Sequence, residues 1–138
     1  MTEQPIGYWI RRLDTALEEV LDRALAEEGV GRRHWQALNV FRNGPVDAAA
    51  LTDRLAPFWT EGAITPAEVV EDLTRRGWLE RTVDGRLGLT AEGASARSRL
   101  SARVEESRRR LAEGITPEEY ATTLNVLRRM AENAQALV

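Results

Sequence analysis

The arginines between residues 75 and 86 are the side chains with the clearest capacity for chemistry in this chain. Arg75, Arg76, Arg81 and Arg86 fall within one short segment, and every one of the 19 basic residues of the chain is an arginine. A guanidinium group presents a planar fork of donors that matches phosphate and the guanine edge, which a lysine ammonium does not. Binding of a nucleic acid is therefore the first functional hypothesis, and the rest of the sequence is compared with it.

A helix is predicted over residues 65–76, around the first two of these arginines. Thr65 is a suitable N-cap, Pro66 suits the first helical position, and Glu68 stands where a capping-box carboxylate reaches back to the N-cap. Gly77 follows as a helix stop. The apolar face of this helix consists of Val69, Val70 and Leu73.

A two-stranded hairpin is expected directly after this helix. Residues 78–83 can pair with residues 86–89 across Asp84-Gly85, a dipeptide favoured in two-residue turns. A helix followed at once by a hairpin is the outline of a winged helix, in which the helix enters a DNA groove and the hairpin, the wing, lies beside it. We call residues 65–76 the recognition helix and expect the DNA-binding part to cover residues 32–89.

Each arginine also has a purely structural interpretation. Arg75 and Arg76 lie in the last turn of the helix, where cations complement the helix dipole, so either could serve the helix rather than DNA. Arg86 could be a soluble turn residue, but its place after Asp84-Gly85 favours contact with the minor groove or with phosphates.

The exposed face of the recognition helix is acidic. It carries Glu68, Glu71 and Asp72, and a carboxylate is repelled by phosphates and usefully meets only the cytosine amino group. Glu68 could be occupied by its cap and Asp72 could face away from the groove. Otherwise, this helix binds DNA weakly or with an unusual preference.

Helical periodicity accounts for most of the remaining chain. Asp47 is expected to cap a short helix that ends at Leu55, and Thr116 with Glu119 forms a second capping box. The predicted fold class is mainly α with a small β-hairpin wing. The further helices are expected over residues 5–28, 32–43, 90–112 and 116–137.

Composition bounds the class of protein. A chain of 138 residues, 43% hydrophobic and 30% charged, is typical of one soluble globular domain, residues 1–138. The absence of cysteine excludes disulfides and thiolate catalysis and favours a cytoplasmic setting. No apolar run approaches the roughly 18 residues that span a bilayer, so no membrane partner is expected. With His34 as the single histidine, no Ser-His-Asp set and no phosphate-binding glycine loop, we predict no catalytic residues, no metal site, no cofactor and no enzyme activity.

The charge distribution sets a condition on DNA binding. The net charge is −3, with three arginines against seven acidic residues in 1–31 and eight against six in 94–138. A DNA-binding surface would have to consist of a few placed arginines on an otherwise acidic protein.

Two segments carry a resemblance to a known family. The sequence LTRRGWLERTVDGRLGLTAEG, residues 73–93, and HWQALNVF in the second helix resemble the MarR family of bacterial winged helix-turn-helix transcriptional regulators. The matching features are the helix stop at Gly77, the wing tip Asp84-x-Arg86 and the entry Leu89-Thr90-x-x-Gly93 to the next helix. The connection APFWTEGAI, residues 56–64, is longer and more apolar than the usual turn of this family.

The resemblance implies a homodimer in which terminal helices 5–28 and 90–138 interlock, and a cleft that takes a small aromatic or anionic effector. We therefore expect a homodimeric regulator, a repressor, whose partners are double-stranded DNA and a second copy. The alternative is an interaction protein of the same fold whose acidic recognition helix has weakened or lost specific DNA binding. Trp9, Trp35 and Phe58 are candidates to stack an effector, or else core and dimer-interface residues. The candidate DNA-binding residues are Thr65, Ala67, Glu68, Glu71, Arg75, Arg76, Arg81, Asp84 and Arg86.

Overall fold

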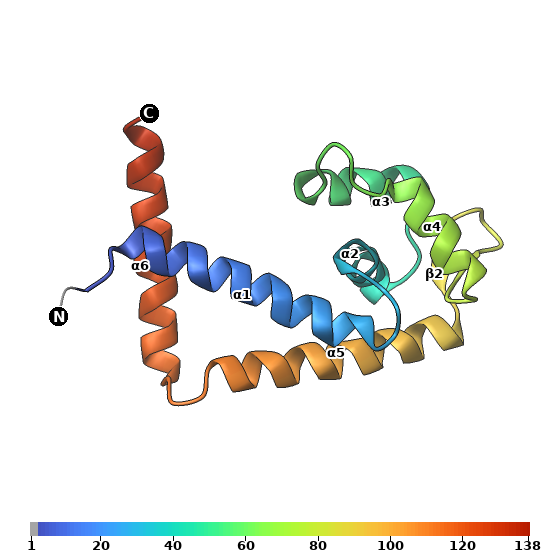
Figure 1. Cartoon of the computed structure of the whole chain (residues 1–138). Helices are drawn as coiled ribbons and strands as arrows, with labels where there is room; N and C mark the ends of the chain where they lie inside the picture. Colours follow the sequence, from blue (N-terminus) through green and yellow to red (C-terminus); the bar gives the residue numbers. More distant parts are fainter. Residues whose placement is uncertain (1–2) are drawn as a thin grey trace. The chain divides into compact units, whose positions relative to one another are not determined.

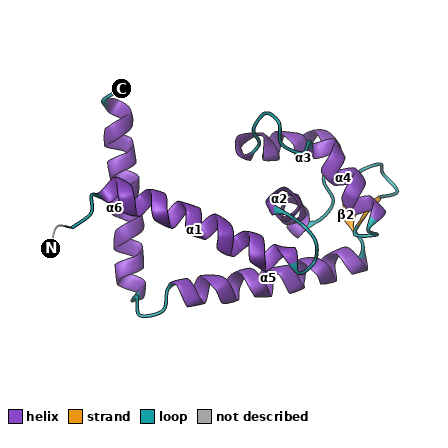
Figure 2. Cartoon of the chain, viewed as in Figure 1, coloured by secondary structure: helices purple, strands orange, loops and turns teal. Residues whose placement is uncertain are grey.

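The computed structural model describes residues 3–138, apart from the side chain of Phe58. It is mainly helical with one small hairpin (Figure 2). The chain divides into two compact units, Met1–Glu105 and Glu106–Val138. Across the described residues, no helix is long and apolar enough to cross a membrane. Whether both units belong to one domain, as the sequence predicts, stays a prediction.

The first unit contains the predicted helices in the predicted order (Figure 1). Its core is built mainly from leucine and valine side chains, and five helices contribute to it, with Leu25, Leu38, Leu51, Leu73 and Leu100 each at most 1% exposed. Burial of these side chains fixes the helices and the wing of the first unit against one another. The helices are α1 (Ile6–Ala26), α2 (Arg32–Val40), α3 (Ala48–Leu55), α4 (Pro66–Arg75) and most of α5 (Ala91–Leu111), with 3-10 turns at Phe41–Asn43 and Ala56–Phe58.

Helix α3 starts after Asp47, as expected, but the Asp47 side chain makes no capping hydrogen bond. The predicted cap is therefore wrong in its chemistry, although the boundary is right. Helix formation here rests on the burial of Leu51 and Leu55, each 1% exposed, rather than on the N-terminal side chain.

The wing is a hairpin of β1 (Leu79–Arg81) and β2 (Leu87–Leu89), with Leu79 opposite Leu89 and Arg81 opposite Leu87. The predicted two-residue turn at Asp84-Gly85 is wrong. The Thr82 amide donates to the Arg86 carbonyl at 2.7 Å, and the Gly85 amide donates to the Thr82 carbonyl at 3.0 Å. With Gly85 in the left-handed region at φ +85°, the loop has three residues, 83–85, and the strands are shorter than expected.

A third segment, which the sequence did not indicate, extends the wing. Val46 forms an antiparallel bridge with Leu87, through hydrogen bonds of 2.8 and 2.9 Å in the two directions. Both residues are buried, so the wing is attached to the segment between α2 and α3 as well as to α4.

The junction between the wing and α5 explains the Leu-Thr-x-x-Gly pattern. Thr90 Oγ1 accepts from the Gly93 amide at 2.9 Å and donates to the Gly77 carbonyl at 2.5 Å, so it caps α5 and holds the end of α4. A Cβ on Gly93 would lie 2.0 Å from the carbonyl oxygen of Trp78. Glycine is required here because the helix backbone touches the start of the wing.

The second unit holds the end of α5, from Glu106 onward, and the whole of α6 (Pro117–Ala136). The predicted capping box is confirmed, since Thr116 Oγ1 accepts from the Glu119 amide at 3.1 Å and the Glu119 carboxylate accepts from the Thr116 amide at 2.9 Å. Among the described residues of α6 none is buried. The exposed apolar side chains of this helix include Tyr120, Leu124, Val126 and Met130.

Candidate nucleic-acid interface

Helix α4 separates a buried face from an exposed one. Val69 and Leu73 are fully buried in the core. Five side chains of the helix are exposed, and they set what the helix offers to a ligand. These are Ala67, Glu68, Glu71, Thr74 and Arg75.

The carboxylate of Glu68 is occupied by the start of its own helix. It accepts from the Thr65 amide at 3.1 Å and from Thr65 Oγ1 at 2.9 Å, while the Glu68 amide donates to Thr65 Oγ1 at 3.2 Å. The hydrogen bond from the Thr65 backbone, followed by that from its hydroxyl, lowers the pKa of Glu68. Thr65 and Glu68 thus form the capping box that the sequence predicts, and their polar atoms serve the helix.

The carboxylate of Asp72 faces the protein. Its Oδ2 lies 2.8 Å from His34 Nε2 on α2 and 3.2 Å from Arg76 Nε, and the Asp72 side chain is only 25% exposed. Burial raises the pKa of Asp72, but hydrogen bonds from Arg76 and His34 outweigh it and lower the pKa overall. Of the acidic residues of α4, this one is a link to α2 and does not belong to the exposed face.

Arg76 is likewise engaged by the protein, although its side chain is 31% exposed. Its guanidinium donates to the carbonyl oxygens of Glu28 at 3.1 Å and of Gly29 at 2.8 Å, just past the end of α1. It also lies over the Trp78 ring, 5.4 Å from the centroid. This geometry favours the structural interpretation of Arg76, although the helix end that it serves is that of α1 rather than its own.

Glu71 and Arg75 remain as the charged pair on the exposed face. Their side chains are 74% and 68% exposed, and Arg75 Nη2 lies 3.6 Å from Glu71 Oε1. Arg75 also approaches Asp72 Oδ1 at 3.5 Å. The exposed face therefore offers the carboxylate of Glu71 and the guanidinium of Arg75 one helical turn apart, beside the Glu68 carboxylate that is held by its cap.

The wing tip is organised around Asp84. Its carboxylate accepts from Thr82 Oγ1 and from Arg86 Nε, the latter at 2.8 Å. The hydrogen bond from Thr82, followed by the contacts with Arg86, lowers the pKa of Asp84. Arg86, 44% exposed, is thus held in place at the tip, and Arg81 Nη1 donates to the Gly85 carbonyl at 2.9 Å.

The three proposed effector-stacking residues lie in different settings. Trp9 is 46% exposed on α1, packed edge-on against Tyr8 at 5.1 Å between ring centroids, with Arg12 over its ring. Trp35 packs against the hydrophobic core. The side chain of Phe58 lies outside the described residues. Among the side chains that the structure describes, the ring contact of Trp9 is with Tyr8 and not with Trp35.

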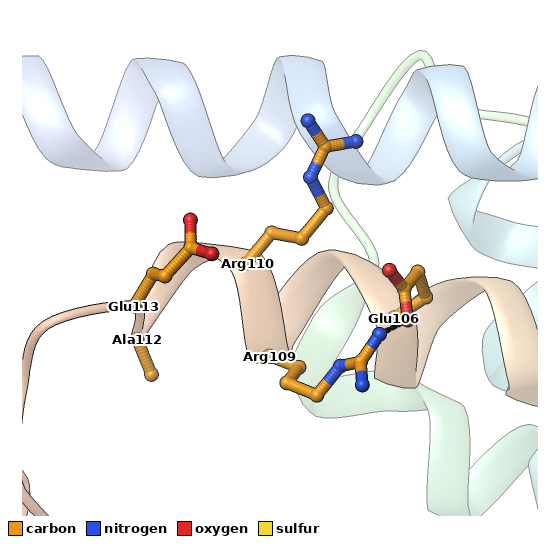
Figure 3. A pocket seen from close by; sticks show the side chains of 5 residues that line it. All are labelled: Glu106, Arg109, Arg110, Ala112 and Glu113. Atoms are coloured by element: carbon orange, nitrogen blue, oxygen red, sulfur yellow. Dashed lines mark hydrogen bonds and ion pairs between the residues drawn. The ribbon is translucent and has the colours of Figure 1, made fainter.

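A shallow open hollow lies elsewhere, at the end of α5 and the turn after it (Figure 3). Charged side chains dominate its lining, and Arg109 pairs with Glu106 across it. Within residues 3–138, no group of His, Asp and Glu side chains could hold a metal ion. The lining residues are Glu106, Arg109, Arg110, Ala112 and Glu113.

Sequence reasoning missed how strongly the segment after α1 is held. Besides the two bonds from Arg76, the Glu28 carboxylate binds Arg99 at 2.8 Å and Arg103 at 3.5 Å on α5. The hydrogen bond from Arg99 outweighs the effect of burial and lowers the pKa of Glu28. The single histidine, His34, is partly exposed on α2, with 12% of its side chain accessible, and its contact is with Asp72 of α4. These contacts join residues far apart in the chain, so no local pattern signals them.

Comparison with known proteins agrees with this geometry. Residues 30–93 match the family model of a winged helix DNA-binding domain. The chain is similar to reduced MarR from E. coli, with 21% identity, a TM-score of 0.70 and coverage of 94% of this chain and 95% of that one. It is also similar to a MarR family protein from Mycobacterium tuberculosis solved in complex with DNA, with 20% identity, a TM-score of 0.71 and coverage of 93% and 98%.

MepR, a transcription regulator of a Staphylococcus aureus multidrug efflux pump, matches with 15% identity, a TM-score of 0.73 and coverage of 95% and 99%. No curated protein matches significantly. The chain therefore contains a winged helix domain and has the fold of MarR family regulators over nearly its whole length.

Proposed function

We propose that this chain, whose winged helix domain stands in a fold shared with MarR family regulators, is a homodimeric transcription regulator that binds specific sequences in double-stranded DNA. The observation that carries the proposal is the arrangement of charged side chains on α4 and at the tip of the wing. Helix α4 has a buried face fixed in the core and an exposed face with Arg75, and the wing beside it ends in an ordered Arg86. This arrangement suits a helix that enters the major groove and a wing that reaches the flanking backbone. The role is one of binding, without catalysis.

The charge of the chain shapes how it would bind. With a net charge of −3, general attraction to the phosphate backbone is weak, so affinity must come from a few placed contacts. Of the acidic residues on α4, Asp72 is paired with Arg76 and contacts His34. Glu68 is held in its cap by uncharged donors and keeps its charge, and the charge of Glu71 is partly offset by Arg75.

Two apolar stripes support assembly as a homodimer. On α1, residues Ile6, Ile10, Leu13 and Leu17 repeat at helical spacing, and each is at least 43% exposed. Helix α6 exposes its own row of large apolar side chains. Surfaces of this kind rarely face water in a monomer, and a two-fold axis would let each copy cover the other. Light scattering at micromolar concentration should give twice the chain mass of 15.5 kDa, and a monomer would contradict the dimer.

The DNA-binding proposal has a direct test. Electrophoretic mobility shift with the region upstream of the protein's own gene, near physiological salt, should show a complex that unlabelled random duplex does not displace. The two recognition helices of a dimer would meet half-sites about one helical turn of DNA apart. Absence of any sequence-selective complex would contradict the proposal. The expected regulatory effect is repression, which a reporter fused to the same region would measure.

Response to a small effector is the second part of the proposal. Trp9, with Arg12 over its ring, is an exposed aromatic side chain beside a cation, which suits an aromatic or anionic ligand. Candidate phenolic ligands should release the DNA complex and quench tryptophan fluorescence, and Trp9→Leu should lessen both responses. If release persists unchanged in that variant, the effector binds elsewhere.

One observation favours a second candidate function. Glu71 occupies the exposed face of α4, where a phosphate-facing carboxylate weakens binding to DNA. An interaction protein that kept the fold but binds another protein would tolerate this residue. A selection from random duplexes separates the two functions, because an interaction protein enriches no motif with or without candidate effectors.

A further inference from the structure

Helix α4 presents a pair of opposite charges at the place where a recognition helix meets base edges. Glu71 and Arg75 stand four residues apart on the face directed away from the core, and both side chains are mostly exposed. The other two acidic side chains of the helix are engaged by the fold, Glu68 in the capping box and Asp72 with His34 and Arg76. Glu71 is thus the acidic residue of α4 whose exposed carboxylate is engaged neither by the helix cap nor by α2.

The chemistry of these two groups restricts the bases that they can meet. An ionised carboxylate is an acceptor without any donor, and in the major groove the suitable partner is the N4 amino group of cytosine. The adenine amino group is less suitable because the acceptor N7 lies beside it and repels the carboxylate. A guanidinium is a donor without any acceptor and matches O6 and N7 of guanine.

The spacing of the pair suits bases that are close together. Four residues of an α-helix rise about 6 Å, which is less than two base-pair steps of about 3.4 Å each. The 3.6 Å separation of the two charged groups also keeps Glu71 next to a cation when the helix approaches the phosphates. A carboxylate that would otherwise oppose binding can therefore contribute selectivity.

We propose that Glu71 and Arg75 are the specificity-determining residues of the recognition helix and select a cytosine and a guanine, respectively, in the same or neighbouring base pairs of each half-site. This inference rests on the proposed function, since it presumes that α4 enters the major groove. Under this proposal Glu71 selects a G·C pair in each half-site and does not merely oppose binding to DNA.

The test is a selection from random duplexes, near physiological salt, with the parent and three variants. Glu71→Gln replaces the carboxylate by an amide that reads adenine through N6 and N7, Arg75→Ala removes the guanidinium, and Glu132→Gln is the control. Glu132 suits the control because it is an exposed glutamate, 61% accessible, paired with Arg128 four residues away on α6. Thermal unfolding of all four proteins verifies that each is folded.

The expected result is a palindrome for the parent whose half-site holds a C·G pair. Glu71→Gln should keep the palindrome but exchange the cytosine for adenine, with a roughly ten-fold or larger loss of affinity for the parent site. Arg75→Ala should lose the preference for guanine, and Glu132→Gln should select the parent motif. If Glu71→Gln selects the same motif as the parent and merely binds all sequences more tightly, the inference is wrong while the proposed function stands. If the parent selects no motif, the proposed function itself fails and the inference falls with it.

Discussion

The guanidinium of Arg76 at the end of the recognition helix donates a 2.8 Å hydrogen bond to the backbone carbonyl of Gly29, just past the end of α1. The carboxylate of the preceding residue, Glu28, binds Arg99 and Arg103 of α5. The short segment at residues 28–29 therefore connects α1, α4 and α5.

Replacing Arg76 by alanine should destabilise the fold. The change removes the hydrogen bonds from Arg76 to the carbonyls of Glu28 and Gly29 and one of the hydrogen bonds to Asp72, and hydrogen bonds of charged groups contribute about 1.5–3 kcal/mol each. We expect a loss of about 1–3 kcal/mol in the free energy of unfolding, measured by urea denaturation. Arg75→Ala is the matched control, since Arg75 is 68% exposed, and it should change stability by less than about 0.5 kcal/mol. Equal losses in both variants would show that the Arg76 contacts add nothing.

Acid should weaken the contacts of the Glu28 carboxylate with Arg99 and Arg103 of α5. The pKa of Glu28 is lowered below its usual 4.5 chiefly by the hydrogen bond from Arg99. Because the unfolded chain then binds more protons than the folded one as the pH falls, this stabilisation is full above about pH 4.5 and is lost below it. Urea unfolding between pH 7 and pH 3 should show this decline. Glu28→Gln should be less stable at pH 7 and decline less steeply below pH 4.5, and an identical slope in parent and variant would exclude Glu28 as a cause.

Gly93 should tolerate no side chain. A Cβ at this position would lie 2.0 Å from the Trp78 carbonyl oxygen, so the first turn of α5 would have to move away from the wing. Gly93→Ala should cost about 1–3 kcal/mol or more, despite the better helix propensity of alanine. Gly7→Ala in α1 is the control, because nothing lies within 4 Å of the added Cβ, and it should cause no loss. Thermal unfolding of both variants checks this; a Gly93→Ala protein as stable as the parent would mean that the junction is flexible.

The features that the sequence predicted well are those that neighbouring residues determine. Thr65 with Glu68 and Thr116 with Glu119 form the two capping boxes expected from their spacing. Gly77 adopts φ +81°, as a residue that ends a helix should. The periodicity of apolar residues located α1, α2, α5 and α6, because apolar side chains recur every three or four residues along each of them.

The features that the sequence missed depend on contacts between distant segments. His34 and Asp72 are 38 residues apart, and nothing near either one predicts their 2.8 Å contact. The bridge between Val46 and Leu87 likewise joins two segments through backbone atoms alone. In the hairpin, Asp84-Gly85 was assigned to a two-residue turn, but the same dipeptide also suits the end of a three-residue loop when Gly85 is left-handed.

The position of Asp72 yields a prediction that separates it from Glu71. Asp72→Asn keeps the shape but removes the charge that faces His34 and Arg76, so it should lower stability. Glu71→Gln should leave stability within about 0.5 kcal/mol of the parent but tighten binding to non-specific DNA, because it removes an exposed negative charge. Urea denaturation and binding of a random duplex at several salt concentrations measure the two effects. If Asp72→Asn behaves as Glu71→Gln in both assays, Asp72 faces the groove in solution.

The wing tip provides the last prediction. Arg86 is held by Asp84 at 2.8 Å with 44% of its side chain exposed, so its guanidinium is ordered before any DNA arrives. Contact with a phosphate or the minor groove then costs less conformational entropy than for a free arginine. Arg86→Ala should weaken binding to the operator by about 1–3 kcal/mol and reduce the salt dependence by about one ion. Asp84→Asn should retain the salt dependence but bind less tightly, because the guanidinium loses its orientation while its charge remains. Arg128→Ala on α6 controls for the loss of a surface charge in general, and equal effects of the Arg86 and Arg128 variants would remove the wing tip from the interface.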